Sequence, residues 1–442
     1  MKLKPLISSC LLAATLSAPV YAENLMQVYR QALDNDPIFL GAGAQLEANL
    51  EGENQSLSRL LPTLSGSFGY DYSKSTSTGL AFQRDDEDIT ESWSVRLQQS
   101  IYDYATWVSY GQAQKRVEQA KIQFQSAEQE LIVRVARAYL DVLRAMDNLE
   151  FAVAAQEAIK QQLEQTKQRY EVGLIAITDV HEAQAEFDQS EADRIAAQNQ
   201  LDNANEALRE ITGRYHDVEG LKSEIPLESP APARIDDWVS VAKQSNKNVI
   251  ANNMALHIAK QDVKRNFGGH LPSVSLNASY SDSTTDISKV EIDGERYGLN
   301  AGISVSIPLY EGGATQSGVR ESSALARKAE YDLESAMRST VRNARQAYLG
   351  VEASIASIKA LEQSVISQDS ALEATQAGFE VGTRTIVDVL LSTRALYRAR
   401  SNLANARYDY IVAILQLKQA AGILTVDDLD MVNDWIVNTV QG

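Results

Sequence analysis

The chain has almost no cysteine: Cys10 is the only one among its 442 residues. It lies within a short apolar stretch, residues 6–16, that follows two lysines near the N-terminus. Residues 20–22, Val-Tyr-Ala, resemble a cleavage site, so residues 1–22 are predicted to be a secretory signal peptide. The exported chain would then contain no thiol, which excludes disulfides as the interaction that holds the fold together.

Basic residues are also scarce, with 41 Lys and Arg against 59 Asp and Glu and a net charge of −18. This balance argues against a nucleic-acid partner, because phosphate groups favour a positive surface. The four histidines (181, 216, 257 and 270) lack the spacing of metal ligands, so no metal or other cofactor is expected. The signatures of hydrolases, zinc peptidases and nucleotide-binding enzymes are missing as well, so no catalytic residue is assigned and no enzymatic activity is expected.

Proline is absent between Pro62 and Pro226 and again after Pro308. Residues 103–170 contain one glycine and are rich in Ala, Gln, Glu, Arg and Leu, which predicts one continuous helix roughly 100 Å long. A second long helix is predicted over 312–378. Shorter helices of similar composition are predicted to be antiparallel partners of the long ones, over 24–58, 178–212, 236–267 and 386–422.

Apolar residues in both long helices follow alternating steps of three and four residues. This spacing is typical of a coiled-coil seam and predicts that the residues are buried. The first helix carries Ile132, Val135, Tyr139, Val142, Met146, Leu149 and Val153. The second carries Val341, Ala344, Tyr348, Val351, Ile355 and Ile358.

The chain also repeats itself. YEVGLIAITDV at 170–180 returns as FEVGTRTIVDV at 379–389, an offset of 209 residues. Other segments return at nearly the same offset, which predicts a tandem duplication. The first repeat is predicted over 23–213, an irregular linker with three prolines over 214–237, and the second repeat over 238–442.

Two hairpins, 62–102 and 271–309, are predicted between the helices. Apolar and polar residues alternate in four segments, 62–72, 92–101, 273–280 and 299–309, which is typical of transmembrane β-strands with one face towards water. The segments between them, rich in Ser, Thr, Asp and Gly, are predicted to be polar loops over 73–91 and 281–298. No helix is predicted to span a membrane, because no run of about 18 apolar residues follows the signal.

Four strands cannot close a barrel in lipid, where every strand edge must be paired and about eight strands are the minimum. The chain is therefore expected to form a homo-oligomer that contacts membrane lipid. Two copies would supply about eight strands and three about twelve, and strand number alone is compatible with both.

An alternative function is that of a structural periplasmic coiled-coil or adaptor protein without a pore. This alternative explains the long helices and their seams. It leaves the four two-faced strands unexplained.

The repeated stretch is predicted to be the turn between two antiparallel helices, at the end furthest from the strands. Gly173 and Gly382 are expected to end the first helix of each pair, and Thr178 or Thr385 to cap the second. An aspartate follows in the first turn of each second helix, where the helix dipole favours a carboxylate: Asp179 and Asp388.

Several segments together resemble the TolC-type outer-membrane efflux proteins, namely ENLMQVYRQAL (23–33), RAYLDVL (137–143), HLPSVSLNASY (270–280) and the two repeated turns. The resemblance covers essentially the whole chain after residue 22. It implies an α+β membrane protein: a homotrimer whose twelve-stranded transmembrane β-barrel, four strands per chain, continues into a long periplasmic α-helical coiled-coil barrel. Such a protein lies in the outer membrane of a Gram-negative bacterium. It is a conduit, gated at its periplasmic tip, that exports drugs, toxins or proteins with a periplasmic adaptor and an inner-membrane RND, ABC or similar pump.

The resemblance also assigns roles to residues at the turns. Asp388 matches an aspartate that lines the closed tip, while Leu391 stands where the family has a second aspartate, so an apolar or single acidic constriction is expected. A tyrosine of the network that holds the tip shut is Phe379 here, so one hydrogen bond cannot form and closure is expected to depend on charge pairing through Arg384. The remaining latch residues implied by the resemblance are Asp179, Thr178 and Arg407.

Overall fold

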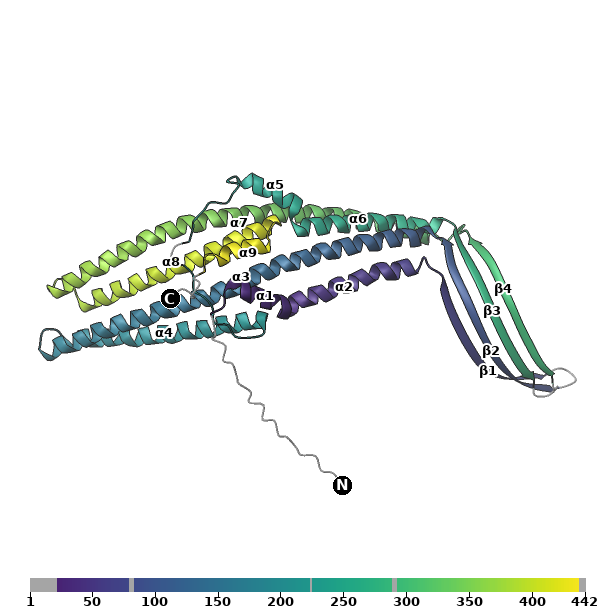
Figure 1. Cartoon of the computed structure of the whole chain (residues 1–442), viewed down its shortest axis with the longest axis horizontal. Coiled ribbons are helices and arrows are strands. Elements are labelled where there is room, and N and C mark those ends of the chain that lie inside the picture. The colour runs from purple at the N-terminus through teal and green to yellow at the C-terminus, as the bar shows by residue number, and fades with distance from the viewer. Residues whose placement is uncertain (1–21, 79–82, 223–224, 288–291, 437–442) are drawn as a thin grey trace, which may run out of the picture.

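The computed structural model describes residues 22–78, 83–222, 225–287 and 292–436. Apart from its last residue, the predicted signal peptide lies outside this range. The molecule is elongated, with a curved sheet at one end and the ends of two helical hairpins at the other (Figure 1). The functional features of the chain are therefore expected at two widely separated ends.

The two halves of the chain contain the same order of elements. The first half forms α1 (Leu25–Asn35), α2 (Pro37–Ser58), β1 (Thr63–Thr78), β2 (Gln83–Tyr102), α3 (Tyr104–Glu171) and α4 (Ile177–Thr212). The second half forms α5 (Ile235–Ser245), α6 (Lys247–Phe267), the short 3₁₀ helix η1 (Gly268–His270), β3 (Ser273–Ile287), β4 (Ile292–Ser306), α7 (Ala314–Glu380), α8 (Ile386–Ala421) and the additional α9 (Val426–Asn433).

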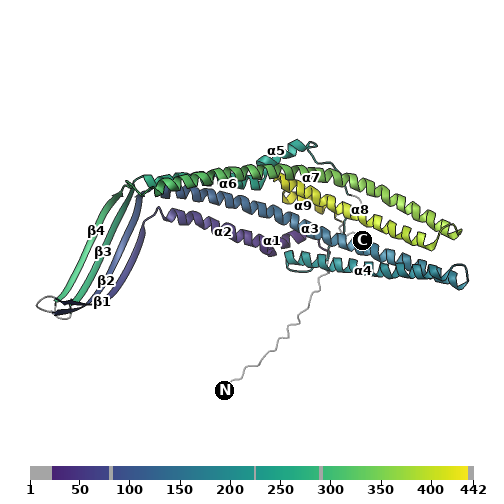
Figure 2. The same cartoon turned by 180° about the vertical axis from the view of Figure 1, so that it is seen from behind.

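The two long helices α3 and α7 run for 68 and 67 residues because no proline interrupts them. Helices α2 and α4 lie one after the other along α3, and α6 and α8 lie one after the other along α7 (Figure 2). Each long helix thus connects the sheet to the far tip.

The expectation of single helices over 24–58 and 236–267 is wrong. Asp36 separates α1 from α2, and Asn246 separates α5 from α6, each with an extended backbone conformation. The Asp36 carboxylate accepts from the Phe39 amide at 2.8 Å, and the Asn246 side chain accepts from the Val249 amide at 3.3 Å. Both residues begin a new helix because a side-chain oxygen satisfies an otherwise unpaired amide.

The four strands form one antiparallel sheet in the order β1-β2-β3-β4. The predicted loops 73–91 and 281–298 are wrong, because the strands continue through most of both segments. Pairing runs without a break from Thr63 opposite Gln98 to Thr78 opposite Gln83. Thr favours extended structure, and the continuous ladder pairs the backbone groups of these polar residues.

The apolar face of the sheet is exposed in the isolated chain. Phe68 and Leu299 are each 75% exposed, and Ile303 and Val305 follow Leu299 on the same face of β4. Among the described strands, β1 and β4 each have a neighbour on one side only. The sheet therefore exposes both an apolar face and two edges.

The main hydrophobic core lies at the middle of the molecule, where α1, α4, α8, α9 and the linker surround α3. Its largest fully buried side chains include Tyr139, Tyr408 and Tyr410. A smaller cluster near the tip joins the two helical hairpins. These two cores are separated by a stretch in which α3 and α8 meet through polar side chains.

The predicted seam of α3 is buried only in its first part. Ile132, Val135, Tyr139 and Val142 are buried, but Met146 is 39% and Val153 46% exposed, so burial of those two is a wrong expectation for the single chain. Polar contacts occupy this level of the α3–α8 contact instead: the Ser401 hydroxyl donates to the Asn148 side-chain oxygen at 2.6 Å. Apolar spacing alone could not show where these polar residues take over.

Candidate functional site at the helical tip

Two short turns form the tip, one between α3 and α4 and one between α7 and α8. Gly173 and Gly382 follow the two long helices with φ of 75° and 82°, a conformation that favours glycine. The Leu174 amide donates to the Arg169 carbonyl at 2.9 Å, and the Thr383 amide donates to the Gly378 carbonyl at 2.8 Å. Both helices therefore end in a Schellman motif, and the expected role of the two glycines is confirmed.

The two turns differ at the start of the following helix. Thr385 begins α8 with a capping box, so its predicted role as a cap is confirmed. Thr178 is not a cap: α4 already begins at Ile177, and the preceding Ala176 has no side chain that can accept a hydrogen bond. Alanine stands where the second repeat has threonine, so only one of the two turns has a side-chain cap.

Asp388 is the carboxylate of that capping box. Its Oδ2 accepts from the Thr385 amide and the Thr385 hydroxyl, both at 2.9 Å. These two hydrogen bonds, together with the positive charge of Arg384, lower the pKa of Asp388 below its ordinary value. Asp388 is therefore a persistently charged group at the tip.

Leu391 lies one helical turn after Asp388 and is 53% exposed. The intervening Val389 and Leu390 are fully buried against the tip cluster. Asp388 and Leu391 thus share the face of α8 that is directed away from this packing. The arrangement offers one charged and one apolar side chain to whatever adjoins this face.

The Arg384 side chain packs against the end of α7, next to Gly378. A side chain at Gly378 would place its Cβ 2.7 Å from the Arg384 Cγ, so the absence of a side chain at Gly378 makes room for the arginine. Within the part of the chain that the structure describes, no ion pair joins Arg384 to Asp179. A link between these two residues from neighbouring copies stays a prediction.

Arg407 lies far from the turns. It is 22 residues beyond Thr385 on α8, about 33 Å along the helix axis. Its guanidinium is 3.6 Å from the Glu362 carboxylate of α7. Within one chain, Arg407 therefore joins α7 to α8 in the middle of the hairpin and not at the turn.

Phe379 occupies the position where the family has a tyrosine. Its ring packs against the tip cluster, whose buried members include Ile159 and Leu163 of α3 and Ile386 of α8. The guanidinium carbon of Arg169 lies 4.4 Å from the ring centroid. The sequence analysis did not identify Arg169. The two repeats differ at this position, with Arg169 in the first and Gly378 in the second, and this difference could have pointed to it.

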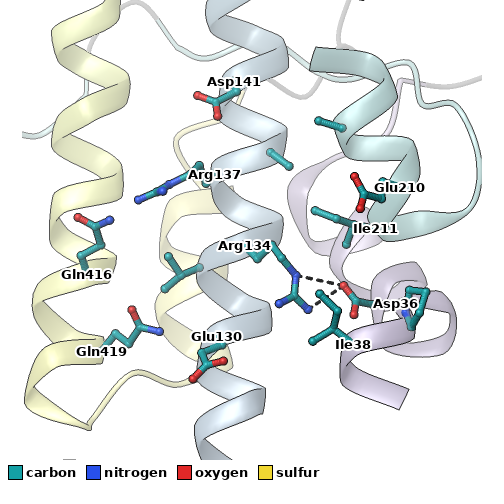
Figure 3. A pocket seen from close by; sticks show the side chains of 14 residues that line it. Asp36, Ile38, Glu130, Arg134, Arg137, Asp141, Glu210, Ile211, Gln416 and Gln419 are labelled. Carbon is teal, nitrogen blue, oxygen red and sulfur yellow. Dashed lines mark hydrogen bonds and ion pairs between the residues drawn. The ribbon is translucent and has the colours of Figure 1, made fainter. Parts of the chain in front are cut away.

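A groove of about 650 Å³ adjoins α3 on the side of α4, α8 and the start of α2 (Figure 3). Its most buried charge is Asp36, whose carboxylate oxygen lies 2.7 Å from the Arg134 guanidinium. The other oxygen of Asp36 accepts from the Phe39 amide. Since this carboxylate is fully engaged within the chain, the ion pair fixes the α1–α2 corner on α3.

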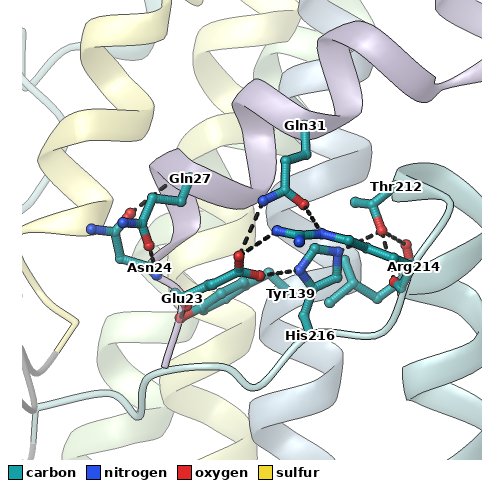
Figure 4. Close-up of polar contacts among 9 residues, drawn as sticks. Glu23, Asn24, Gln27, Gln31, Tyr139, Thr212, Arg214 and His216 are labelled. Atoms are coloured by element: carbon teal, nitrogen blue, oxygen red, sulfur yellow. Dashed lines mark hydrogen bonds and ion pairs between the residues drawn. The ribbon is translucent and has the colours of Figure 1, made fainter. Parts of the chain in front are cut away.

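A polar cluster holds the start of α1 against the linker (Figure 4). The Glu23 carboxylate accepts hydrogen bonds from Gln31, Arg214 and His216. Burial raises the pKa of Glu23, but these hydrogen bonds and the charges of His216 and Arg214 outweigh it, so the pKa lies below its ordinary value. The hydroxyl of the buried Tyr139 donates to the Glu23 carbonyl at 3.1 Å.

Within residues 22–78, 83–222, 225–287 and 292–436, no group of three or more His, Cys, Asp or Glu side chains is arranged to hold a metal ion. In the same ranges, no helix combines the length and the apolarity needed to cross a membrane.

Solved structures with the same fold include outer-membrane channels. The Campylobacter jejuni CmeC outer membrane channel superposes with a TM-score of 0.78 at 16% identity, over 94% of this chain and 90% of that one. The open state of the Neisseria gonorrhoeae MtrE outer membrane channel gives a TM-score of 0.70 at 17% identity, over 91% and 90% of the two chains.

Curated relatives match nearly the full length. The outer membrane protein TolC of Vibrio cholerae is 44% identical over 436 residues, which cover 98% of each chain. TolC of Escherichia coli is 38% identical over 95% of this chain and 86% of the relative. The alkaline protease secretion protein AprF of Pseudomonas aeruginosa is 31% identical over 93% and 87%.

A family model described as "Outer membrane efflux protein" matches residues 28–214 and 238–423, so both halves of the chain match the same model. The expected resemblance and the expected tunnel fold are confirmed. The chain belongs to the outer membrane efflux protein family: it is an export channel of the Gram-negative outer membrane whose helices extend into the periplasm.

Proposed function

We propose that three copies of the chain assemble into one conduit. The observation that carries this proposal is the sheet β1–β4, with its exposed apolar face and its two open edges. Three sheets of four strands make about twelve strands, enough to enclose an aqueous channel, with β4 of one copy beside β1 of the next. Closure would pair both edges in lipid, where unpaired backbone groups are costly.

In this trimer the helices of residues 23–213 and 238–442 act as two repeats, joined by the linker 214–237, around a periplasmic helical barrel. The conduit exports drugs, toxins or proteins and has no catalytic role of its own. Efflux and protease secretion in the names of its relatives support this range of cargo. A periplasmic adaptor and an inner-membrane RND, ABC or similar pump would deliver the cargo to the tip.

The tip is the gate of this conduit. Asp388 and Leu391 face away from the packing of α8, so three copies would bring three carboxylates and three leucines to the axis. The latch that holds the gate shut comprises Asp179, Thr178, Arg384 and Phe379 at the turns, with Arg407 further along α8, where it pairs with α7. The Arg384 charge and the Asp179 carboxylate would meet between copies.

Extraction in mild detergent followed by insertion into planar bilayers tests the channel. We expect a heat-modifiable trimer and discrete single-channel currents. A monomer that forms no pore, or a soluble coiled coil that needs no detergent, would contradict the proposal. Cysteine cross-linking across β4 and β1, for example from Ile303 to Leu64, then tests the pairing of neighbouring copies.

A further inference from the structure

The two turns of the tip are unequal at one pair of matching positions. Arg169 of the first repeat corresponds to Gly378 of the second, since the offset is 209 residues. In the second turn the missing side chain leaves room for Arg384. In the first turn the arginine side chain is present and reaches the opposite hairpin.

The contact that Arg169 makes is with an aromatic ring. Its guanidinium carbon lies 4.4 Å from the centroid of Phe379, well within the range of a cation–π interaction. Both side chains are half-buried. Among the described residues, no carboxylate lies within ion-pair distance of Arg169, so the ring is the group that faces this charge.

The contact joins two different hairpins. Arg169 lies in the last turn of α3, and Phe379 lies in the last turn of α7. The ring also packs against the tip cluster, which includes Leu163 of α3 and Ile386 of α8. Separation of the two hairpins at the tip would therefore remove the cation from the ring.

A cation in the last turn of a helix is also favoured by the helix dipole. The dipole explains a positive charge at position 169 but not its position over a ring of another helix. A dipole effect would be independent of the side chain at 379. The two explanations therefore differ in whether residues 169 and 379 act together.

We propose that Arg169 is a positioning residue of the gate, and that its cation–π contact with Phe379 holds the α3–α4 hairpin against the α7–α8 hairpin in the closed state. This inference rests on the proposed function as a gated channel. It assigns the link to the face of the ring, so the hydroxyl group of the family tyrosine is not required. Arg169 thereby supplies a latch contact in a chain that lacks that hydroxyl.

Single-channel recording of a double-mutant cycle tests the inference. Arg169→Gln removes the charge, and Phe379→Leu keeps an apolar side chain but removes the ring. We expect each single variant to raise the open probability of the channel about fivefold, and the double variant to resemble either single one. Phe379→Tyr, which keeps the ring, should not raise the open probability.

Arg209→Gln is the matched control. Arg209 is also a cation in the last turn of its helix, α4, and its guanidinium lies 4.7 Å from the ring of Tyr215, but this contact is distant from the tip. Removal of this charge should leave the open probability unchanged.

The outcomes separate the two proposals. The inference is wrong if pores form but the Arg169 and Phe379 variants conduct like the wild type. It is also wrong if the free-energy effects of the two substitutions on opening add independently. In both cases the proposed channel function is unaffected. If the wild type itself forms no pore, the proposed function is wrong and the inference fails with it.

Discussion

Thr385 and Asp388 cap the start of α8 reciprocally. The Thr385 amide and hydroxyl donate to the Asp388 carboxylate, and the Asp388 amide donates to the Thr385 hydroxyl at 3.3 Å. The residue proposed to line the constriction is thus also the residue that fixes the helix start. Charge at the gate and local structure are coupled through one side chain.

This coupling predicts how ion selectivity depends on pH. The pKa of Asp388 is lowered, so the carboxylate stays charged below the ordinary pKa of an aspartate and loses its charge only as the pH falls through the lowered value. Reversal potentials under a salt gradient should therefore show cation preference that persists into acid. Thr385→Ala should shift the loss of preference to higher pH, and Asp388→Asn should abolish it. Anion preference, or an unchanged preference in Asp388→Asn, would contradict the constriction.

Gly378→Ala should open the gate although it favours the helix. Alanine in place of glycine favours a helix by about 1 kcal/mol, but the added Cβ would lie 2.7 Å from Arg384 and displace it. We expect the single-channel conductance to rise, and Arg384→Ser, which removes the guanidinium itself, should raise it by the same amount. Gly350→Ala in the same helix is the control, because nothing lies within 4 Å of the added Cβ. Equal conductance in both glycine variants would show that the position of Arg384 does not affect closure.

The strand assignment predicts which face of β4 tolerates charge. Ile303 and Val305 lie on the exposed apolar face, so aspartate at either position should cost a few kcal/mol, about 1–3, and impair membrane insertion. Ser304 faces the opposite side, and Ser304→Asp should be mild. Yield of the heat-modifiable form after membrane extraction is the measurement. A lower yield for Ser304→Asp than for the other two variants would show that the assignment of the lipid-facing and water-facing sides of the sheet is wrong.

The polar cluster at Glu23 predicts loss of stability in acid. Its folded-state pKa lies below the ordinary 4.5, so its contribution is complete above the ordinary value and is lost as the pH falls through the folded value. Glu23→Gln should destabilise the protein by about 1–3 kcal/mol at neutral pH and flatten the decline of the unfolding midpoint below pH 4.5. Glu118→Gln, at an exposed pair with Lys115, should change neither. Thermal unfolding monitored by circular dichroism measures both.

Much of the fold could be predicted because it follows from local rules. The lack of proline specifies α3 and α7, and Gly173 and Gly382 specify the ends of those helices. The two helix breaks that were not predicted have weaker signals in the sequence. Asp36 is followed by a proline, which can also begin a helix, and Asn246 has only its capping side chain. The strands are longer than predicted because their polar segments, within 73–91 and 281–298, also pair their backbone groups with the neighbouring strand.

The candidate site was predictable in position but not in contacts. Repetition located the turns, and the family resemblance pointed to Asp388 and Phe379. The partner of Phe379 lies on a different helix more than 200 residues away, and no spacing rule connects it to Arg169. Thr178 failed as a cap because the helix begins one residue before it, a boundary that propensity does not resolve.

The unbroken length of α3 and α7 restricts how the gene can change. Insertion of one residue in α3 would turn everything beyond it by about 100° and advance it by about 1.5 Å. The residues at Arg169 and Leu163 would then face away from α7 and α8, even with no substitution at the tip. Length can therefore vary by near-whole heptads, about seven residues, and only if the partner helices change by the same amount. Insertions and deletions should accumulate in the β-hairpins and the linker, while the helical part evolves almost entirely by substitution.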